Sequence, residues 1–299
     1  MSVLVVGSVA FDAVETPHGK RDRMLGGAGT FFALAASYFT KVGVVAVVGE
    51  DFGDDEMRVF HARDICTKGI ERVSGKSFFW AGKYSDDLAD RVTLDTQLNV
   101  FATFAPQVPD GYQDHRFLML GNIDPKLQSH VQSQMKATFV GGDTMNYWIS
   151  DHLPALTETL KGLDVLLIND HEARQLTGER HLVRAAAAIH AMGPSSVVIK
   201  RGEFGASLYR EGRVFTAPAY PVEEVRDPTG AGDSFAGGFM GYLASCPEVN
   251  DAEMRRAMIY GSVMGSFCVE QFGTERLQNL TKDEITTRYR QFKELMHFD

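Results

Sequence analysis

The fold is decided by residues 227–235, which read Asp-Pro-Thr-Gly-Ala-Gly-Asp-Ser-Phe and run into the helix-compatible segment 236–244. Gly230 and Gly232 allow the backbone to turn sharply and to present its N–H groups in one direction. The positive end of the following helix adds to them, so the loop predicts a cradle for developing negative charge, as in phosphoryl transfer. Asp233 lies at the edge of this cradle, where a carboxylate can accept the proton of an attacking hydroxyl. Without its surroundings, the same loop would be a glycine-rich turn with Asp233 as a helix N-cap.

Outward from this loop, short apolar runs alternate with segments of helical length. The apolar runs are 3–6, 42–48, 117–120, 138–140, 165–168 and 197–199, and the helical segments are 28–40, 54–68, 125–136, 153–161, 170–176 and 181–191. Buried strands that alternate with helices indicate an α/β fold with a mainly parallel sheet covered on both faces. Segment 281–297 predicts one more amphipathic helix.

Two stretches depart from this alternation. Residues 11–25 and 76–101 alternate polar and apolar side chains and are rich in β-formers, with a turn expected at 82–90. They predict antiparallel strands with one solvated face, which form a small separate sheet. Such a sheet is well placed to be a lid over a site at the strand ends of the main domain. The expected main domain comprises residues 1–10, 26–75 and 102–299.

Composition restricts the partners. The 299 residues carry a net charge of −9, which disfavours unspecific nucleic-acid binding but leaves local binding of phosphate by backbone N–H groups open. No apolar run reaches the roughly 18 residues of a membrane span, and the glycine-rich N-terminus reads as a strand rather than a signal peptide. Cys66, Cys246 and Cys268 are far apart and form no CxxC pair. We therefore expect buried thiols in a cytoplasmic protein, with neither a nucleic-acid nor a membrane partner.

The segment DPTGAGDSFAGGF at 227–239 resembles the C-terminal signature of the ribokinase (PfkB) family of carbohydrate and nucleoside kinases, whose usual form is DTTGAGD. Pro228 replaces the more common Thr. The resemblance implies a ribokinase-like three-layer fold with a β-sheet lid, and Asp233 as the catalytic base. It implies that the anion hole consists of the N–H groups of Gly230, Ala231 and Gly232. It further implies ATP and Mg²⁺ as cofactors, and a monovalent cation such as K⁺ at Asp227, Thr229 and Gly273.

The N-terminal third of the chain supports the resemblance in the right order. Gly26-Gly27-Ala28-Gly29 resembles the family's Gly-Gly signature, which lets the substrate lie close to the backbone. Asp12 resembles the aspartate that grips substrate hydroxyls, although a lone Asp after a first strand would more simply form a turn. Val48-Gly49-Glu50-Asp51-Phe52-Gly53 resembles the structural VGxDxFG turn. The resemblance therefore implies substrate binding by Asp12, Gly26 and Gly27.

Two further segments concern the cofactors. Asn169-Asp170-His171-Glu172 matches the NxxE motif, which in the family organises Mg²⁺ through water. A Glu at the end of a buried strand is costly unless it is paired or near a cation, and the same residues can also cap a helix start. Residues 199–206 resemble the strand and turn before the nucleotide site. The implied nucleotide-binding residues are Lys200, Gly202, Gly205 and Thr229.

One departure concerns the substrate. Phe31 stands where sugar kinases of this family usually carry a hydroxyl-binding Asn, and Ala28 stands where several carry Lys. We expect Phe31 and the aromatic Phe79 of the lid, which is followed by Trp80, to contact the substrate, with packing of the lid as the alternative. Lys83 and Arg91 of the lid could still meet a phosphate. The substrate class stays open among sugars, nucleosides and sugar phosphates.

The expected function is that of an ATP-dependent kinase acting on a hydroxyl of a sugar or sugar-like molecule. The alternatives are a nucleoside kinase, a non-catalytic ligand-binding relative, and a dehydrogenase that only the fold class favours. Rival motifs fail, because the chain has no complete Walker P-loop, no dinucleotide fingerprint, no G-x-S-x-G and no HExxH. Apolar residues at 78–80 and 98–101 suit pairing of two lids in a homodimer, and covering of the substrate explains them equally well.

Overall fold

The computed structural model describes residues 2–297 and contains a nine-stranded main sheet of order β13-β12-β11-β10-β9-β8-β1-β4-β5. All neighbours from β5 to β11 are parallel, whereas β12 and β13 are antiparallel at one edge. The strands are β1 Ser2–Val6, β4 Lys41–Val48, β5 Cys66–Arg72, β8 Phe117–Leu120, β9 Phe139–Gly142, β10 Val165–Asn169, β11 Ser196–Lys200, β12 Ala206–Arg210 and β13 Arg213–Ala217.

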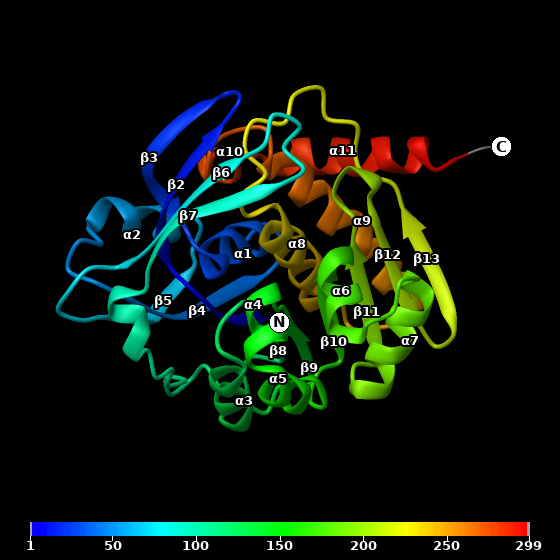
Figure 1. The fold of residues 1–299 in the computed structure, drawn as a ribbon, viewed down its shortest axis with the longest axis horizontal. Coiled ribbons are helices and arrows are strands. Elements are labelled where there is room, and N and C mark those ends of the chain that lie inside the picture. Colours follow the sequence, from blue (N-terminus) through cyan, green and yellow to red (C-terminus); the bar gives the residue numbers. More distant parts are fainter. Residues whose placement is uncertain (1, 298–299) are drawn as a thin grey trace.

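Helices cover both faces of this sheet (Figure 1). One face carries α1 Ala28–Ala36, α2 Asp54–His61, α8 Ala231–Ser245, α9 Asp251–Cys268, α10 Glu275–Gln278 and α11 Lys282–Leu295, and the other carries α3 Pro125–Ser133, α4 Asn146–Asp151, α5 Leu153–Leu160, α6 Asp170–Thr177 and α7 Leu182–Met192. In β1, Val3 and Val5 join the first core while Leu4 and Val6 join the second, because successive side chains of a strand point to opposite faces. The expected three-layer α/β fold is confirmed. Within residues 2–297, no helix combines the length and apolarity that crossing a bilayer requires.

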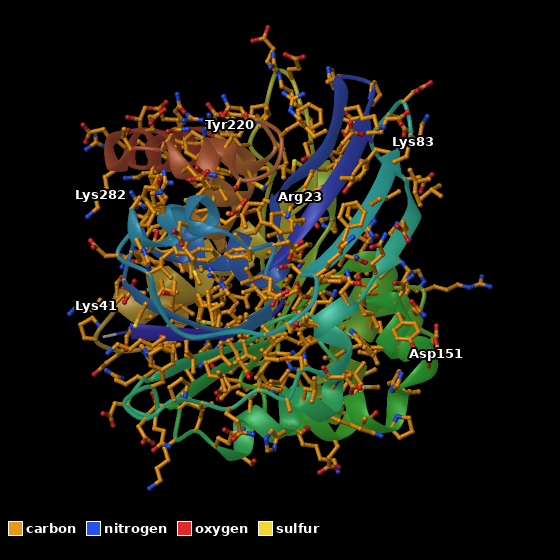
Figure 2. The ribbon with its side chains drawn as sticks, turned by 90° about the vertical axis from the view of Figure 1, so that its left-hand side faces the viewer. Arg23, Lys41, Lys83, Asp151, Tyr220 and Lys282 are labelled. Atoms are coloured by element: carbon orange, nitrogen blue, oxygen red, sulfur yellow. The ribbon has the colours of Figure 1, made fainter. Side chains whose placement is uncertain are left out.

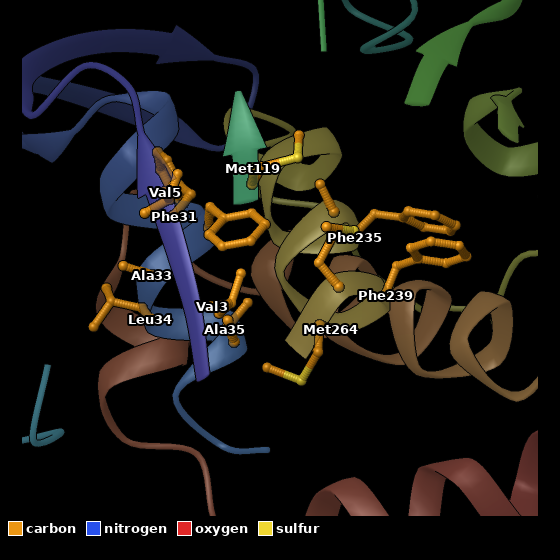
Figure 3. Close-up of a cluster of buried hydrophobic side chains, with 14 of the residues drawn as sticks. Val3, Val5, Phe31, Ala33, Leu34, Ala35, Met119, Phe235, Phe239 and Met264 are labelled. Carbon is orange, nitrogen blue, oxygen red and sulfur yellow. The ribbon is translucent and has the colours of Figure 1, made fainter. Parts of the chain in front are cut away.

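Helix α8 is held tightly between α1 and α9. A Cβ atom on Gly237 would lie 2.4 Å from the Phe32 carbonyl oxygen, and one on Gly238 would lie 2.6 Å from the Tyr260 carbonyl oxygen. Glycine therefore allows both neighbouring helices to approach the α8 backbone. Figure 3 shows the apolar side chains that α1 and α8 contribute to the same core. The N-terminus of α8 is fixed by this packing.

The structure differs from the predicted helix at residues 54–68 and contains a hairpin at 206–217 that was not predicted. The helix expected over 54–68 ends at His61, because Asp64 adopts the left-handed backbone (φ 53°) and residues from Cys66 onward pair with β4. The β12–β13 hairpin was not anticipated, although Glu211 and Gly212 both have positive φ, as hairpin turns of two residues require.

A second, four-stranded sheet, called here the small sheet, has the order β3-β2-β6-β7. Its strands are β2 Ala10–Thr16, β3 Gly19–Gly26, β6 Phe78–Tyr84 and β7 Arg91–Gln97. The pairs β2–β3 and β6–β7 are antiparallel as expected, but β2 and β6 run parallel to each other. In Figure 1 the small sheet lies at one end of the molecule, apart from the main sheet.

Asp51 ties the small sheet to the main domain. Its Oδ1 atom accepts hydrogen bonds from the backbone N and the Oγ of Ser77, both at 2.7 Å. Arg23 of β3, labelled in Figure 2, donates to Asp51 Oδ2 at 3.2 Å. Asn99 Nδ2, after β7, donates to the Ser77 carbonyl at 2.9 Å. The segment that leads into β6 and strand β3 thus meet at the Asp51 carboxylate, and the segment that leaves β7 is tied to the same place through Ser77.

Candidate active site

Three neighbouring strands of the main sheet end in polar residues. Asp143 follows β9, Asn169 ends β10, and Lys200 ends β11, where it is in register with Asn169. The carboxyl ends of parallel strands form one edge of a sheet, which is where α/β proteins bind ligands. The N-terminus of α8 reaches the same edge, since a Cβ atom on Gly232 would lie 3.1 Å from Lys200 Nζ. The predicted residues Lys200 and Gly232 are therefore brought together.

The loop before α8 requires glycine at position 230. Gly230 has φ 76°, and a Cβ atom there would lie 2.4 Å from the ring of Phe31. No side chain among the described residues caps α8, so N–H groups of its first turn remain available to an anion. The Ala231 N–H already donates to the Pro228 carbonyl at 3.2 Å. Of the three amides expected in the anion hole, that of Ala231 is thus partly used by the turn itself.

Asp233 is half-buried in the first turn of α8. Burial, followed by the negative charge of Asp143, raises the pKa of Asp233 to about 7, while Lys200 and Arg91 act in the opposite direction. A general base is most effective when its pKa lies near the working pH. Asp233 therefore has the location and the basicity that proton abstraction from a hydroxyl needs.

Asp143 is a site residue that the sequence did not reveal. Its carboxylate is buried, accepts the Thr144 N–H at 2.9 Å, and lies 3.8 Å from Lys200 Nζ. Burial raises the pKa of Asp143, and Lys200 lowers it. In the sequence, Asp143 stands out only as an Asp that follows the apolar run 138–140 and two glycines. Which residues lie near Asp143 in space depends on the strand order of the sheet.

Asn169 and Glu172 cap α6 reciprocally. Asn169 Oδ1 accepts the Glu172 N–H at 2.8 Å, and Glu172 Oε2 accepts the Asn169 N–H at 3.0 Å. Burial and the charge of Asp143 raise the pKa of Glu172 to about 7. Within residues 2–297, no group of three or more His, Cys, Asp or Glu side chains could hold a metal ion. A cation here would take its remaining ligands from water or phosphate oxygens, as Mg²⁺ commonly does.

Asp12 lies against the predicted glycine pair. A Cβ atom on Gly26 would lie 1.9 Å from Asp12 Oδ2, and the Gly27 N–H donates to that oxygen at 3.4 Å. The pair therefore makes room for the Asp12 carboxylate. Burial raises the pKa of Asp12 to about 7 against the effect of the Gly27 hydrogen bond, and the charges of Asp227 and Asp233 raise it further.

The small sheet presents Trp80, not Phe79, on the face of Asp12. Across β2 and β6, Asp12 pairs with Trp80 and Phe11 pairs with Phe79, and paired residues share a face of the sheet. Phe79 instead packs with the main core on the opposite face. The Trp80 indole lies over Gly82, where a Cβ atom would be 2.1 Å from the ring, and donates to Thr93 Oγ1 at 3.3 Å. The structure therefore places Trp80, rather than the predicted Phe79, on the same face as Asp12.

Phe31 is not on the surface of the site. Its side chain is 1% exposed and belongs to the main core, where it lies beneath Gly230 between α1 and α8 (Figure 3). It supports the loop from below. A substrate contact by Phe31 was expected, and the structure replaces this with a packing contact.

The three residues expected around a monovalent cation are brought together. The side chain of Asp227 is fully buried, and its two oxygens accept the N–H groups of Thr229 and Gly273, both at 2.9 Å. Burial raises the pKa of Asp227. Thr229 Oγ1 lies 3.1 Å from the hydroxyl of Tyr84, which joins the loop to β6 of the small sheet.

The turn after β11 contains the other predicted nucleotide contacts. Gly202 and Gly205 both have positive φ, at 54° and 84°, and the Arg201 N–H donates to the Gly205 carbonyl at 2.8 Å. Lys200 precedes this turn and is the member that reaches the N-terminus of α8.

Arg91 brings a cation from the small sheet. Its guanidinium carbon lies 5.0 Å from the centre of the Trp80 ring. Arg91 pairs with Tyr84 across β6 and β7, and Tyr84 contacts Thr229. The positive charge of Arg91 lowers the pKa values of Asp12, Asp233 and Glu172.

A separate cavity lies away from these residues. It has a volume of about 790 Å³ and lies between β5 and the segment after β7, with Glu71, Lys76, Asn99 and Thr103 in its lining. None of the carboxylates described above lines it. This cavity is therefore separate from the cluster of carboxylates at the strand ends.

The sequence matches the pfkB family of carbohydrate kinases over residues 2–281, a span that contains every site residue described above. The chain belongs to the pfkB family of carbohydrate kinases. It is accordingly a kinase of the sugar and nucleoside type, a phosphotransferase with a hydroxyl group as acceptor.

Two relatives in sequence and one solved structure of the same fold are similar to this chain. The cytidine kinase of Thermococcus kodakarensis is 30% identical over 256 residues, covering 83% of this chain and 90% of that protein. The nucleoside kinase of Methanothermobacter thermautotrophicus is 28% identical over 297 residues and 91% of each chain. The fructokinase of Vibrio cholerae, solved with fructose, ADP and calcium, shares the fold with a TM-score of 0.81 and 17% identity, over 96% of this chain and 98% of that one.

Proposed function

We propose that this chain is an ATP-dependent nucleoside kinase. The observation that carries the proposal is the position of Trp80 beside Asp12 on one face of the small sheet. A nucleoside offers a flat base and a hydroxyl-bearing sugar. An indole ring supplies a stacking surface for the base, and a carboxylate accepts hydrogen bonds from the sugar. The names of two relatives, a cytidine kinase and a nucleoside kinase, support the same substrate class.

We assign separate roles in substrate binding, proton transfer and charge stabilisation to the residues of the site. Asp12, with the backbone of Gly26 and Gly27, holds the sugar hydroxyls. Asp233 takes the proton of the attacking hydroxyl, since its pKa of about 7 keeps a large fraction ionised at neutral pH. The N–H groups at the start of α8 stabilise the charge on the transferring phosphoryl group.

We assign the cofactors to residues at and after the ends of β10 and β11, together with Thr229. Lys200, Gly202, Gly205 and Thr229 would bind the nucleotide, and Asn169 and Glu172 would meet Mg²⁺ through water. When bound, ATP with Mg²⁺ supplies a phosphoryl group whose charge the metal partly neutralises. The raised pKa of Glu172 fits such a cation, because a positive ion would relieve the repulsion between Glu172 and Asp143.

A monovalent cation would bind beside Asp227, Thr229 and Gly273. Because both Asp227 oxygens already accept backbone N–H groups, a cation there would stiffen the loop before α8 rather than join the chemistry. To test this, K⁺ is titrated into enzyme in a buffer whose only other cation is a bulky organic one, and kcat is measured. Stimulation of kcat supports the site, and an unchanged rate up to physiological K⁺ removes it from the proposal.

The small sheet would act as a lid over the nucleoside, and two lids would pair in a homodimer. Val92 and Leu94 of the edge strand β7 are 63% and 59% exposed, and an exposed apolar edge invites pairing. Light scattering on the wild type and on a V92K/L94K variant tests this, with a dimer and a monomer expected, respectively. Cys66, Cys246 and Cys268 are unbonded, in keeping with a reducing cytoplasm.

The decisive experiment is an ADP-release assay over matched nucleosides and free sugars. We expect the best nucleoside to exceed ribose and fructose at least about tenfold in kcat/KM, which corresponds to roughly 1.4 kcal/mol of binding to the base. A free sugar that is used better than every nucleoside would overturn the proposed substrate class. The kinase assignment itself would survive that result.

A further inference from the structure

We propose that Asp143 is a positioning residue for phosphoryl transfer. Its carboxylate holds the Lys200 ammonium group beside the N-terminus of α8, and the ammonium group there faces the phosphoryl group that is being transferred. The inference rests on the use of ATP proposed above. It adds a residue outside the sequence motifs to the machinery of the reaction.

Asp143 and Lys200 meet because of the strand order. Asp143 follows β9 and Lys200 ends β11, and β10 lies between these two strands. The two side chains are 9% and 15% exposed, so solvent screens their charges only weakly. A buried charge needs a partner, and each of these residues provides one for the other.

The separation of the two charges leaves Lys200 free to bind an anion. Lys200 Nζ is 3.8 Å from Asp143 Oδ1, which is beyond ordinary hydrogen-bond length. The carboxylate therefore attracts the ammonium group without taking up its donors. All three N–H donors of a lysine can still turn toward phosphate oxygens.

The place of Lys200 beside α8 is unfavourable without a counter-charge. The ammonium group lies 3.1 Å from the point where a Cβ atom on Gly232 would be, at the positive end of the helix. Two positive groups converge there, and the Asp143 carboxylate offsets their repulsion. Gly232 thereby has a second use, because a Cβ atom at this position would crowd the ammonium group and require it to shift.

The residue after Asp143 carries a buried hydroxyl group without a protein partner in the described part of the chain. The Thr144 side chain, directly after Asp143, is 4% exposed, and its hydroxyl has no hydrogen-bond partner among residues 2–297. Buried hydroxyl groups in folded proteins are normally paired. A phosphate oxygen or a metal-bound water would satisfy it.

The test compares D143N, K200M and the D143N/K200M double variant. K161M is the matched control, since Lys161 is an exposed lysine paired with Glu158 far from the strand ends. We measure kcat and the KM for ATP with the best acceptor found, whether nucleoside or sugar. We also measure the rise in melting temperature caused by inorganic tripolyphosphate, which needs no acceptor.

For K200M we expect kcat to fall about 100-fold or more, as for the loss of one charge-stabilising donor, together with weaker binding of tripolyphosphate. For D143N we expect kcat to fall about tenfold, while tripolyphosphate binds as well as before or more tightly because a negative charge has been removed. The double variant should be no slower than K200M, since Asp143 acts through Lys200. K161M should match the wild type.

Two results would overturn the inference. The first is a D143N enzyme with kcat within twofold of the wild type, and the second is a double variant whose loss is the product of the two single losses. If D143N fails to fold, D143E keeps the charge and serves instead, with a smaller loss of kcat expected and the same comparison in the K200M background. Failure of the proposed nucleoside specificity would appear only in the acceptor screen.

Discussion

The two sides of the site are built differently. On the main-domain side, Asp143, Lys200 and Asp233 lie on the ends of parallel strands and on a helix packed between two others. On the other side, Trp80 and Arg91 belong to the small sheet, whose strand β7 is exposed along its whole length. Rigid, buried elements fix catalytic groups more precisely than exposed ones. We therefore expect changes on the first side to alter kcat and changes on the second side to alter KM.

The largest expected effect tests the main-domain side. Asp233→Asn removes the base while keeping its size, so kcat should fall about 1,000-fold or more, as is typical for the loss of general base catalysis. Binding of ADP, followed by calorimetry, should change little because the N-terminus of α8 is intact. Asp151→Asn, at an exposed carboxylate on α4, is the control and should keep the wild-type rate. A D233N enzyme with near-normal turnover would remove Asp233 from the reaction.

The next effect tests the small-sheet side. Trp80→Leu should raise the KM for a nucleoside about tenfold or more, because stacking of a base on an aromatic ring contributes roughly 1–3 kcal/mol. Phe79→Leu, one residue away on the opposite face, should leave KM within about threefold and lower stability instead. Steady-state kinetics and urea denaturation separate the two outcomes. Equal rises in KM would mean that strand alternation does not decide which aromatic ring meets the substrate.

The titration of Asp233 predicts how the rate depends on pH. With the pKa of Asp233 raised to about 7, the base is lost by protonation as the pH falls, so kcat/KM should decrease about tenfold per unit below pH 7. The profile is measured from pH 5 to pH 9. W80L should show the same inflection at a lower rate, since Trp80 does not titrate. A rate that stays level down to pH 5 would contradict the raised pKa.

The smallest effect concerns stability. In the folded protein burial raises the pKa of Asp12 to about 7 from an ordinary value of 3.8, so the folded state favours the protonated form. Protonated Asp12 therefore makes its full stabilising contribution to the free energy of unfolding at low pH, and this contribution is lost as the pH rises to about 7. Asp12→Asn should stabilise the fold at pH 8 on the order of 1 kcal/mol, or a few degrees in melting temperature, and little at pH 4. A variant less stable than the wild type at pH 8 would show that the hydrogen bond from Gly27 outweighs the burial.

The main-domain side could be predicted largely from sequence, because its signals are local. Gly230 and Asp233 lie within one short loop, and Asn169 and Glu172 within one helical turn, so spacing alone places each pair. Asp143 could not be found in this way. Its partner Lys200 is distant in the chain, and only the strand order β9-β10-β11 brings the two together.

The small-sheet side was harder to predict for a related reason. The period of two in a strand shows that Phe79 and Trp80 face opposite ways, but not which of them faces the site. That depends on the parallel register between β2 and β6, in which paired residues are 68 positions apart in the chain, and parallel pairing was not expected there. Phe31 was expected to contact the substrate, and the structure shows its ring turned into the core beneath Gly230.

The attachment at Asp51 has a practical consequence for engineering. Ser77, Arg23 and the segment at Asn99 all converge on Asp51 and its immediate partner, so one compact locus carries many of the polar contacts of the small sheet. The contact of Tyr84 with Thr229 is a second attachment. Residues 10–26 and 77–99 can therefore be treated as an exchangeable cassette. A chimera that takes these segments from a relative, while keeping Asp51 and the residues that contact it, should acquire the donor's acceptor preference on an unchanged phosphoryl-transfer frame.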